Sequence, residues 1–549
     1  MMNLGKKVVY QIYPKSFYDS NNDGLGDIRG IIEKIDYLAK LNIDFIWFNP
    51  FFVSPQYDNG YDIADYRKID PKFGTMEDFE ELSAKLKEHN IGIMLDMVFN
   101  HCSTEHEWFK KALAGDPKYQ AYFYLRDPKP DGSLPNNWQS KFGGPAWAKF
   151  GDTGKYYLHL YAPQQADLDW HNPDVRQEAF DIVNFWRSKG VSGFRFDVLN
   201  VIGKDTVLVD STDPVEEKKL YTDTPVVQEY IKELNANSFG QDAESITVGE
   251  MSSTTIENSI KYSNPDEHEL SMVFSFHHLK VDYDNGEKWS LVPFDFKKLK
   301  QIMFDWQSGM DKGNGWQALF WNNHDQPWAL NRFGDPVHYR EKSAEMLATT
   351  THLLRGTPYI YMGEELGMVD PSYKSMDNYV DIEAINAYDE LVKTHTPEEA
   401  FKIVHSKARD NSRTPMHWDD SEYAGFSQSK PWLIPTDQDE INAEKELASG
   451  EIFDYYQKLI KLRKSEDVIS DGHFSPLLED DDQVFAYLRT LNDEKLAVFN
   501  NFYGKETEID VPADLQASGH VLISNYGRQL DSLPAKLTLK PYESLAFKF

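Results

Sequence analysis

Charged side chains stand at the ends of several short apolar runs in this sequence. Arg195 and Asp197 lie two positions apart in GFRFDVL, Glu250 follows SITVG, and Asp325 follows ALFWNNH. Paired carboxylates without a cluster of metal ligands are the groups that hydrolyse glycosidic bonds, one as the nucleophile and one as the acid. Sugar hydrolysis is therefore the first hypothesis for this chain.

The neighbours of each carboxylate suggest its role. Arg195 and Asp197 share one face of a strand, and a cation so close lowers the pKa of a carboxyl, as an ionised nucleophile requires. Glu250 is expected in a less cationic, partly apolar setting, where it can hold a proton near neutral pH. Asp325 and two histidines at strand ends, His101 and His324, are expected to bind sugar hydroxyls and to stabilise an oxocarbenium-like transition state. Each residue alone would fit a buried salt bridge, but charges at three strand ends are costly without a use.

Eight apolar runs alternate with helical patterns along most of the chain, as parallel strands buried on both faces do. The helices between them have readable ends, since Thr75 caps MEDFEELSAKLKEH and Asn172-Pro173 opens a helix that Gly190 closes. Such alternation predicts an α/β fold, a (β/α)8 TIM barrel, with its active site where strands end and loops begin. The runs are VVYQIYP, DFIWFNP, GIMLDMV, GFRFDVL, SITVGEM, SMVFSFH, ALFWNNH and TPYIYMG.

Two segments depart from this alternation. Residues 102–170 are rich in Gly, Pro and aromatic residues, which predicts an inserted loop-rich subdomain after the third strand. Residues 467–549 alternate polar and apolar positions, which predicts a C-terminal antiparallel β-domain, a β-sandwich. The catalytic barrel would comprise residues 1–101 and 171–466, and two or three domains are expected of 549 residues.

The composition limits partners and compartment. The chain has 57 basic and 89 acidic residues, and a net charge of −32 argues against nucleic acid or an anionic membrane as a partner. The first residues contain no apolar run long enough for a signal peptide or a membrane span. Cys102 is the only cysteine, which excludes a disulfide within the chain. We expect a cytoplasmic monomer without an organic cofactor.

Six motifs in order resemble those of glycoside hydrolase family 13, the α-amylase family. DMVFNH, GFRFDVLN, VGEMSS and FWNNHDQP resemble its four signature regions, and QADLDW and TPYIYMGEE resemble two supporting motifs. The resemblance runs from VVYQIYPKSF to the C-terminal domain. It implies a retaining double displacement on an α-glucosidic bond, with Asp197 as nucleophile, Glu250 as acid/base and Asp325 as stabiliser of the transition state.

The resemblance also implies contacts around the sugar at the −1 subsite. Tyr61 in DNGYDIADY would stack on that sugar. The hydrogen-bond donors to it would be His101, Arg195 and His324.

A charge pair is implied at the closed end of the pocket. Asp58 would pair with Arg409, with Arg413 as the alternative partner, and the pair would block further sugars and make the enzyme exo-acting.

Two positions differ from the common family wording, with Cys102 in place of Thr and Asp169 in place of Asn. Neither is a catalytic carboxylate.

The segment DSNNDGLGD offers oxygen ligands at alternating positions. It resembles half an EF-hand loop with Gly24 at the turn, but Gly30 stands where the bidentate Glu belongs. An ordinary Asx-rich turn is the alternative. The family resemblance favours a structural Ca²⁺, because related oligo-glucosidases bind an ion here; the ligands would be Asp19, Asn21, Asp23, the carbonyl of Leu25 and Asp27.

A basic segment follows the sixth run. SMVFSFHHLKVDYDNGEK contains His277, His278, Lys280 and Lys288. Oligo-1,6-glucosidases read something like FQFEH there, whereas this wording is similar to that of the trehalose-6-phosphate hydrolases. Lysine and histidine can hold a phosphate through charge-assisted hydrogen bonds, and so acidic a chain needs such local compensation. The plain glucose would occupy −1 and the phosphorylated one +1, giving glucose and glucose 6-phosphate. The sequence leaves open which of the four side chains contacts the phosphate.

Other hypotheses stand beside this one. On residue types alone, the basic segment fits a solvated loop whose lysine pairs with Asp282 or Asp284. An oligo-1,6-glucosidase or dextran glucosidase acting on isomalto-oligosaccharides, or a sucrose isomerase, would share the barrel. Val198 after the nucleophile also occurs in α-1,6-acting members, so it does not discriminate. A non-catalytic sugar-binding protein is disfavoured because all three carboxylates are present.

Overall fold

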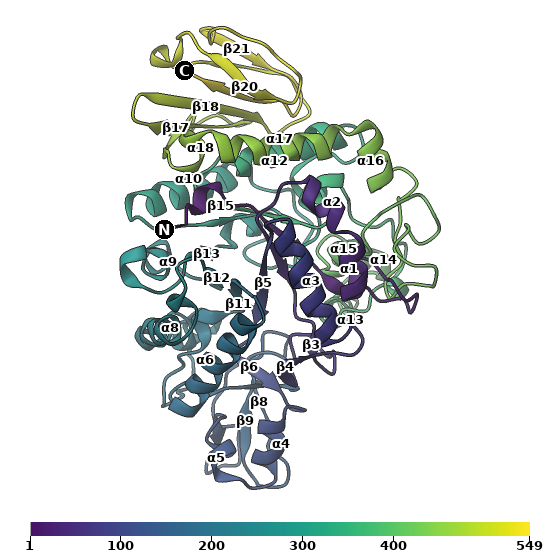
Figure 1. The fold of residues 1–549 in the computed structure, drawn as a ribbon. Helices are drawn as coiled ribbons and strands as arrows, with labels where there is room; N and C mark the ends of the chain where they lie inside the picture. Colours follow the sequence, from purple (N-terminus) through teal and green to yellow (C-terminus); the bar gives the residue numbers. More distant parts are fainter. Residues whose placement is uncertain (1) are drawn as a thin grey trace. The chain divides into compact units, whose positions relative to one another are not determined.

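The structure, a computed structural model, describes residues 2–549 and divides into two compact units. Trp47–Ser275 belong to the first unit, and Asn3–Ile46 and Phe276–Phe549 belong to the second. Each of the eight predicted runs contains a strand, and Figure 1 labels most of them. The strand β2 (Phe45–Phe48) contains the boundary between the units.

In the first unit, four strands pair in parallel in the order β13-β12-β11-β5. Every residue of β11 is buried, as in parallel strands covered on both faces, and Arg195, its only charged residue, is paired with carboxylates. The register places Arg195 of β11 beside Asp96 of β5 and beside Val248 of β12. The strands are β5 (Gly92–Met97), β11 (Gly193–Phe196), β12 (Ile246–Glu250) and β13 (Met272–Phe274).

The helices of this unit begin where the sequence predicts. Thr75 caps α3 and forms a capping box with Asp78, and the Asn172 side chain accepts a hydrogen bond from the backbone of Asp174 at the start of α6. The helix α6 ends at Ser188, two residues before Gly190. The helices are α3 (Met76–Glu88), α4 (Glu107–Leu113), α5 (Pro117–Gln120), α6 (Pro173–Ser188), α7 (Pro214–Tyr221), α8 (Pro225–Asn237) and α9 (Ile256–Ser263).

Short strands and loops fill the chain between β5 and α6. Figure 1 shows α4 and α5 beside β8 and β9. Cys102 of β6 is fully buried and lies opposite Ala166 of β10. The short strands of this unit are β3 (Phe52–Val53), β4 (Asp65–Ile69), β6 (His101–Ser103), β7 (Leu125–Arg126), β8 (Trp147–Lys149), β9 (Tyr156–Leu158) and β10 (Gln165–Asp167).

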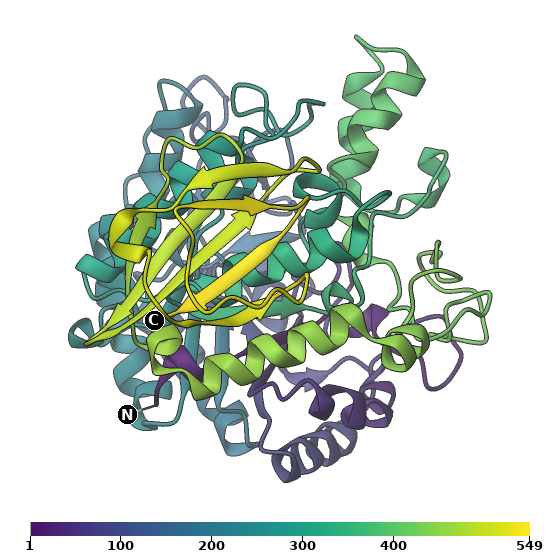
Figure 2. The same cartoon turned by 90° about the horizontal axis from the view of Figure 1, so that it is seen from above.

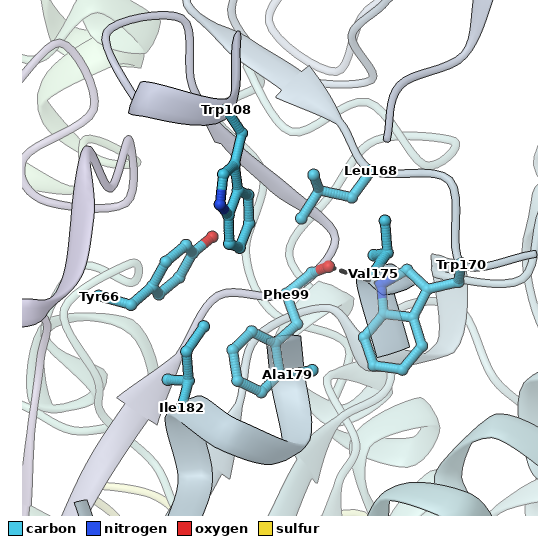
Figure 3. A pocket seen from close by; sticks show the side chains of 8 residues that line it. All are labelled: Tyr66, Phe99, Trp108, Leu168, Trp170, Val175, Ala179 and Ile182. Carbon is cyan, nitrogen blue, oxygen red and sulfur yellow. Dashed lines mark hydrogen bonds between the residues drawn. The ribbon is translucent and has the colours of Figure 1, made fainter. Parts of the chain in front are cut away.

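Aromatic side chains of this loop-rich segment line a small void together with Val175, Ala179 and Ile182 of α6. Tyr66 stacks on Trp108 with ring centroids 5.9 Å apart, and the indole of Trp170 donates to the carbonyl of Phe99 at 2.8 Å (Figure 3). The void that they line measures about 10 Å³, room for one water molecule at most. This region is therefore packed core and not a sugar site.

In the second unit, β1, β15 and β14 pair in parallel in that order. The strands are β1 (Val9–Ile12), β14 (Ala318–Leu319) and β15 (Thr357–Tyr361). The helices are α1 (Ile28–Glu33), α2 (Ile35–Lys40), α10 (Phe296–Lys312), α11 (Ala329–Phe333), α12 (Arg340–His352), α13 (Ile382–Leu391), α14 (Pro397–His405), α15 (Asp410–Arg413), α16 (Ala443–Ser449), α17 (Glu451–Ser465) and α18 (Asp467–Ser470).

The second unit ends in an antiparallel β-structure. Five strands form a sheet in the order β16-β17-β18-β22-β20, and β19 pairs with β21. Their inner faces enclose an apolar cluster that includes Phe499, Leu537 and Phe547. Figure 2 shows α17 running beside this sheet. The strands are β16 (His473–Leu477), β17 (Val484–Leu491), β18 (Glu494–Asn501), β19 (Thr507–Asp510), β20 (His520–Ser524), β21 (Lys536–Leu539) and β22 (Ser544–Lys548).

Over residues 2–549, no helix has the length and apolar character needed to cross a membrane.

Candidate active site

One arginine contacts three carboxylates at the ends of neighbouring strands in the first unit. Arg195 Nη1 donates to Asp96 Oδ1 and to Asp197 Oδ1, each at 2.7 Å, and Nη2 donates to Glu250 Oε2. Arg195 is 2% exposed, and burial tends to lower the pKa of its guanidinium, but Asp96, Tyr61 and Asp197 outweigh burial and raise that pKa. The cation fixes the positions of the predicted nucleophile and the predicted acid.

The contact between Arg195 and Glu250 contradicts one expectation. The sequence predicts a less cationic setting for Glu250 than for Asp197, yet both carboxylates hydrogen-bond to the same guanidinium. The reason is geometric, because the side chains of Arg195 on β11 and Glu250 on β12 converge at the carboxyl ends of paired strands. The difference between nucleophile and acid must arise from groups other than Arg195.

The backbone turns sharply directly after Asp197. Val198 has φ 35° and ψ 43°, a left-handed conformation that is unfavourable for a β-branched residue. Such strain is characteristic of functional sites. It ends β11 so that Asp197 stands at the tip of the strand, where its side chain is 11% exposed.

Asp96 accepts hydrogen bonds from two aromatic side chains in addition to Arg195. The hydroxyl of Tyr61 donates to Asp96 Oδ2 at 2.9 Å, and the indole of Trp47 donates to the same oxygen at 3.2 Å. Asn49 donates to the hydroxyl of Tyr61 at 2.7 Å. Tyr61, predicted to stack on the sugar, is therefore tied by its hydroxyl to the same carboxylate as Arg195.

His101 lies in the same unit and is uncharged at neutral pH. Burial lowers the pKa of its imidazole to about 4, although Asp167 acts in the opposite direction. Its Nε2 lies 3.2 Å from the carbonyl oxygen of Tyr61 and 3.2 Å from Gln165 Nε2. Gln165 Nε2 also donates to Asp58 Oδ2 at 3.0 Å. Gln165 thus links two predicted sugar-binding residues, His101 and Asp58.

In the second unit, three positively polarised groups surround Asp325. Arg413 Nη2 lies 2.7 Å and Arg409 Nη1 3.4 Å from Asp325 Oδ1, and His324 Nε2 lies 3.1 Å from Oδ2. Burial tends to raise the pKa of the Asp325 carboxyl, but His324, Arg409 and Arg413 outweigh it and hold that pKa well below its usual range. Asp325 is ionised at neutral pH.

The orientation of His324 is set by a glutamine on β1. Gln11 Nε2 lies 2.9 Å from His324 Nδ1, and both residues are buried. An amide nitrogen can only donate, so Nδ1 accepts and Nε2 carries the proton. The Nε2–H of His324 then points at Asp325.

Arg409 binds a second acid that the sequence reading does not identify. Its Nε and Nη2 donate to the two oxygens of Asp381 at 3.0 and 2.6 Å, and its Nε lies 3.3 Å from Glu383. Burial tends to raise the pKa of Asp381, but Arg409 overrides it and brings this pKa to about 2. The pair of Asp58 with Arg409 or Arg413 stays a prediction.

The basic segment divides into packed and charged members. His277 packs on Trp306 with ring centroids 5.2 Å apart, and burial lowers the pKa of its imidazole to about 4, so it carries no charge at neutral pH. His278 Nε2 donates to the carbonyl of Phe320 at 2.9 Å. Residues His277–Lys280 form a short 3-10 helix, and Lys280 at its end is exposed.

Lys288 belongs to a chain of ion pairs that ends at Asp325. Its Nζ lies 2.7 Å from Glu383, Glu383 contacts Arg409, and Arg409 contacts Asp325. The Lys288 side chain is 20% exposed. Through these ion pairs, Lys288 is connected to a predicted catalytic carboxylate.

Asp282 does not pair with a lysine of the basic segment. Its carboxylate binds Arg332, at 3.0 Å from Nε and 2.7 Å from Nη2, and Lys407, at 2.5 Å. The alternative interpretation of the basic segment is therefore wrong for Asp282. Arg332 and Lys407 lie 50 and 125 residues from Asp282 in the sequence, so local sequence patterns could not identify them as its partners.

The segment of residues 19–27 forms a series of Asx turns. Asp19 accepts from the backbone of Asn22 at 2.7 Å and of Gly24 at 2.8 Å, and Asp27 caps α1 by accepting from Gly30 at 2.7 Å. Asn21 and Asp23 accept from the backbone two residues ahead. Within residues 2–549, no group of three or more His, Cys, Asp or Glu side chains is arranged to hold a metal ion. A Ca²⁺ ion here would need carbonyl and amide oxygens as ligands in addition to carboxylates.

Comparison with known proteins identifies the family. Residues 11–472 match the family model described as alpha amylase, catalytic domain, and residues 484–545 match the alpha-amylase SusG C-terminal domain. The chain belongs to the α-amylase family. It is a glycoside hydrolase, and the predicted fold, a (β/α)8 barrel with an inserted subdomain after strand three and a C-terminal antiparallel β-domain, is confirmed.

Relatives of this α-amylase family member match along nearly their whole length. A trehalose-6-phosphate hydrolase of Bacillus subtilis is 48% identical over 99% of this chain and 97% of its own. An oligo-1,6-glucosidase of Parageobacillus thermoglucosidasius is 44% identical over 98% of each chain. The crystal structure of a Bacillus licheniformis trehalose-6-phosphate hydrolase has a TM-score of 0.96 and 50% identity, covering 99% of both chains.

Sequence reading missed several polar residues of the site. Gln11 and Gln165 lie in runs that motif comparison had already singled out, VVYQIYP and QADLDW, so attention to every polar residue of those runs would have found them. Asp381 and Glu383 lie at the start of α13, in a segment without a recognisable motif. Only the fold brings these two acids to Arg409.

Proposed function

We propose that this chain is a retaining, exo-acting α-glucosidase that hydrolyses trehalose 6-phosphate to glucose and glucose 6-phosphate. Whole-length similarity to proteins named trehalose-6-phosphate hydrolase supports this reading. The observation that carries it is the place of Lys288, a cation in an ion-pair chain that ends at Asp325. A phosphorylated leaving group needs such a cation in a chain with a net charge of −32.

The proposed mechanism assigns one role to each carboxylate. Asp197 attacks the anomeric carbon while Glu250 protonates the leaving oxygen, and Glu250 then activates the water that hydrolyses the glycosyl-enzyme. Both carboxylates bind one guanidinium, which holds them close to each other at the ends of neighbouring strands. Asp325, ionised by its cationic neighbours, stabilises the positive charge that develops on the sugar.

The remaining polar residues position the sugar at the −1 subsite. His101 is neutral and donates or accepts a hydrogen bond without adding charge. His324, held by Gln11, presents a proton toward Asp325 and the sugar hydroxyl beside it. Tyr61 would offer its ring, and the predicted pair of Asp58 with Arg409, or with Arg413, would close the pocket to longer chains.

The phosphate at +1 is held in this proposal by Lys288, with Lys280 as a second cation. Lys288 Nζ donates to Glu383 and lies 4.7 Å from the centroid of the Trp289 ring, and an ammonium has two further N–H groups that can donate to a ligand. His277 supports the segment by packing on Trp306, and His278 supports it through a hydrogen bond to a backbone carbonyl. His277 is neutral and adds no charge to the site.

A second candidate is an oligo-1,6-glucosidase acting on isomalto-oligosaccharides. The 44% identity to an oligo-1,6-glucosidase over 98% of the chain favours it. The experiment that separates the two is release of glucose from trehalose 6-phosphate, trehalose and isomaltose at equal concentration. A strong preference for the phosphorylated sugar supports the first proposal, and a preference for isomaltose replaces it with the second.

Three further proposals concern the setting of the enzyme. A structural Ca²⁺ at residues 19–27 is supported by oxygen atoms at five alternating positions and by the backbone hydrogen bonds to Asp19 that shape the turn. A cytoplasmic location is supported by the single buried thiol of Cys102 and by the charge of the proposed substrate. A monomeric state is to be tested by sedimentation.

A further inference from the structure

A cavity of about 410 Å³ opens in the second unit, and the proposed reaction gives it no role. Small-molecule sites have volumes of this order and combine apolar walls with a few polar groups. One wall of this cavity is charged and comes from four separate segments, which contribute Asp282, Arg332, Asp370 and Lys407. The other wall is apolar and comes from the stretch between the basic segment and α10, namely Leu291, Val292, Pro293 and Phe294.

The charged wall holds an excess of positive charge. Two cations, Arg332 and Lys407, bind one carboxylate, that of Asp282. The side chains of Arg332 and Lys407 are each 4% exposed, and that of Asp282 is 6% exposed. Burial of a charge without a counter-charge is costly, so this wall favours an anion in the cavity.

Two other titratable residues of the lining do not fully cancel this charge. Asp370 is half-buried at the cavity, and desolvation raises the pKa of its carboxyl to about 7, so about half of it is protonated at neutral pH. Its carboxyl accepts from the backbone of Trp328 at 2.9 Å. Burial also lowers the pKa of His405, which leaves its imidazole uncharged.

Both cations retain hydrogen-bond donors. Lys407 Nζ donates to the carboxylate and to the carbonyl of Asp282, which uses two of its three N–H groups. Arg332 donates twice to Asp282, once to the carbonyl of Leu279 and once to Gln326 Oε1 at 3.1 Å, which uses four of its five. Each cation can therefore add one charge-assisted hydrogen bond to an anion.

The mouth of the cavity carries exposed aliphatic side chains. Leu291 is 62% exposed and Val292 is 36% exposed, and adjacent exposed aliphatic residues beside a hollow are a feature of binding sites. The C–H face of a sugar ring packs on such groups. A ligand with one anionic group and one sugar ring would match both walls.

We propose that this cavity is a second ligand site that binds a phosphate group, either free or carried by a sugar. The choice of phosphate over other anions rests on the proposed function, since phosphate is the anion of its substrate and of one product. Gln326 follows Asp325 directly, and it accepts from Arg332. An occupant of the cavity thus lies one hydrogen bond from the loop of a predicted catalytic residue.

Calorimetric titration of the full chain tests the site. The Lys280→Ala/Lys288→Ala double variant is titrated with inorganic phosphate, glucose 6-phosphate and glucose, because this background lacks both cations proposed to hold the phosphate at the active site. We expect one site per chain that binds both phosphate compounds and not glucose. Tighter binding of glucose 6-phosphate identifies a sugar phosphate as the ligand, and equal binding identifies free phosphate.

Two variants in the same background locate the binding. Lys407→Gln removes the excess charge and should weaken phosphate binding at least about tenfold. Leu291→Glu adds a negative charge at the mouth and should weaken it several-fold, roughly threefold to tenfold. Val337→Glu is the matched control, because Val337 is 79% exposed and does not line the cavity. Thermal unfolding shows that each variant is folded.

The outcomes separate this site from the proposed function. If the Leu291 and Val337 variants bind phosphate equally, or if no phosphate binding is found in the Lys280→Ala/Lys288→Ala background, the cavity is not a phosphate site. If binding depends on Lys407 while trehalose 6-phosphate is not hydrolysed, the site stands and the proposed function falls.

Discussion

Replacement of Lys288 by alanine tests the proposed phosphate contact most directly. The ammonium of Lys288 lies 2.7 Å from Glu383 with its side chain 20% exposed, so it is partly desolvated and has donors left for a ligand. A hydrogen bond to a charged group contributes about 1.5–3 kcal/mol. Its loss should lower kcat/KM for trehalose 6-phosphate roughly 10- to 150-fold.

The comparison of two substrates isolates the phosphate. An uncharged aryl α-glucoside places the same glucose at −1 and has no phosphate, so Lys288→Ala should change its kcat/KM less than about threefold. Raised ionic strength should weaken turnover of trehalose 6-phosphate and should hardly change turnover of the aryl glucoside, because salt screens charged contacts.

The partner acid supplies the matched variant. Glu383→Gln removes the counter-charge of Lys288 and a neighbour of Arg409, and leaves the ammonium in place. If Lys288 binds phosphate, this variant should retain the preference for the phosphorylated substrate. Equal losses on both substrates in Lys288→Ala, matched by Glu383→Gln, would show that Lys288 only supports Arg409, and would refute the assignment.

Four other predictions follow from particular contacts. Asp197→Asn should lower turnover of every substrate by on the order of 10⁴-fold or more and leave thermal unfolding nearly unchanged; turnover close to wild type would remove Asp197 from the mechanism. Gln11→Leu removes the group that fixes the tautomer of His324, and should lower kcat about 10- to 100-fold with little change in KM, as loss of an orienting partner does. Asp381→Asn concerns acid stability: the folded pKa of Asp381 is depressed to about 2, so its contribution of about 2 kcal/mol is present above pH 4 and is lost as pH falls toward 2. Urea unfolding of the variant should therefore show a deficit that is largest at neutral pH and shrinks between pH 4 and 2, and a constant deficit would contradict it. Removal of Ca²⁺ with a chelator should lower the melting temperature of wild type and not that of Asp23→Ala, with activity at 25 °C unchanged; identical shifts in both would place the ion elsewhere or show that none binds.

Much of the fold follows from local pattern in this chain. The eight apolar runs each contain a strand, and the caps at Thr75 and Asn172 begin helices as expected. The run ALFWNNH is the least regular, since β14 comprises only two of its residues. The side chain of Asn322 donates to Glu364 at 2.6 Å and accepts from the backbone of Ala329 at 2.7 Å, which favours a loop there over a longer strand.

The sequence predicted those residues of the site whose role follows from residue type and from the surrounding motif. Carboxylates at strand ends and the motifs around them single out Asp197, Glu250 and Asp325. The contact of Arg195 with Glu250 depends on how the side chains of β11 and β12 converge, which composition does not contain. The neutral state of His277 depends on burial against Trp306, and the partners of Asp282 come from distant segments. Such properties belong to tertiary packing and cannot be read from spacing.

The burial of the only cysteine gives the chain a practical property. Cys102 is fully buried in β6, and burial raises the pKa of its thiol, so little reactive thiolate reaches the solvent. A cysteine introduced on the surface would then be the sole group to react with a maleimide dye. Leu291→Cys places such a dye at the mouth of the cavity, where its fluorescence would report the arrival of a ligand directly, without any turnover of substrate.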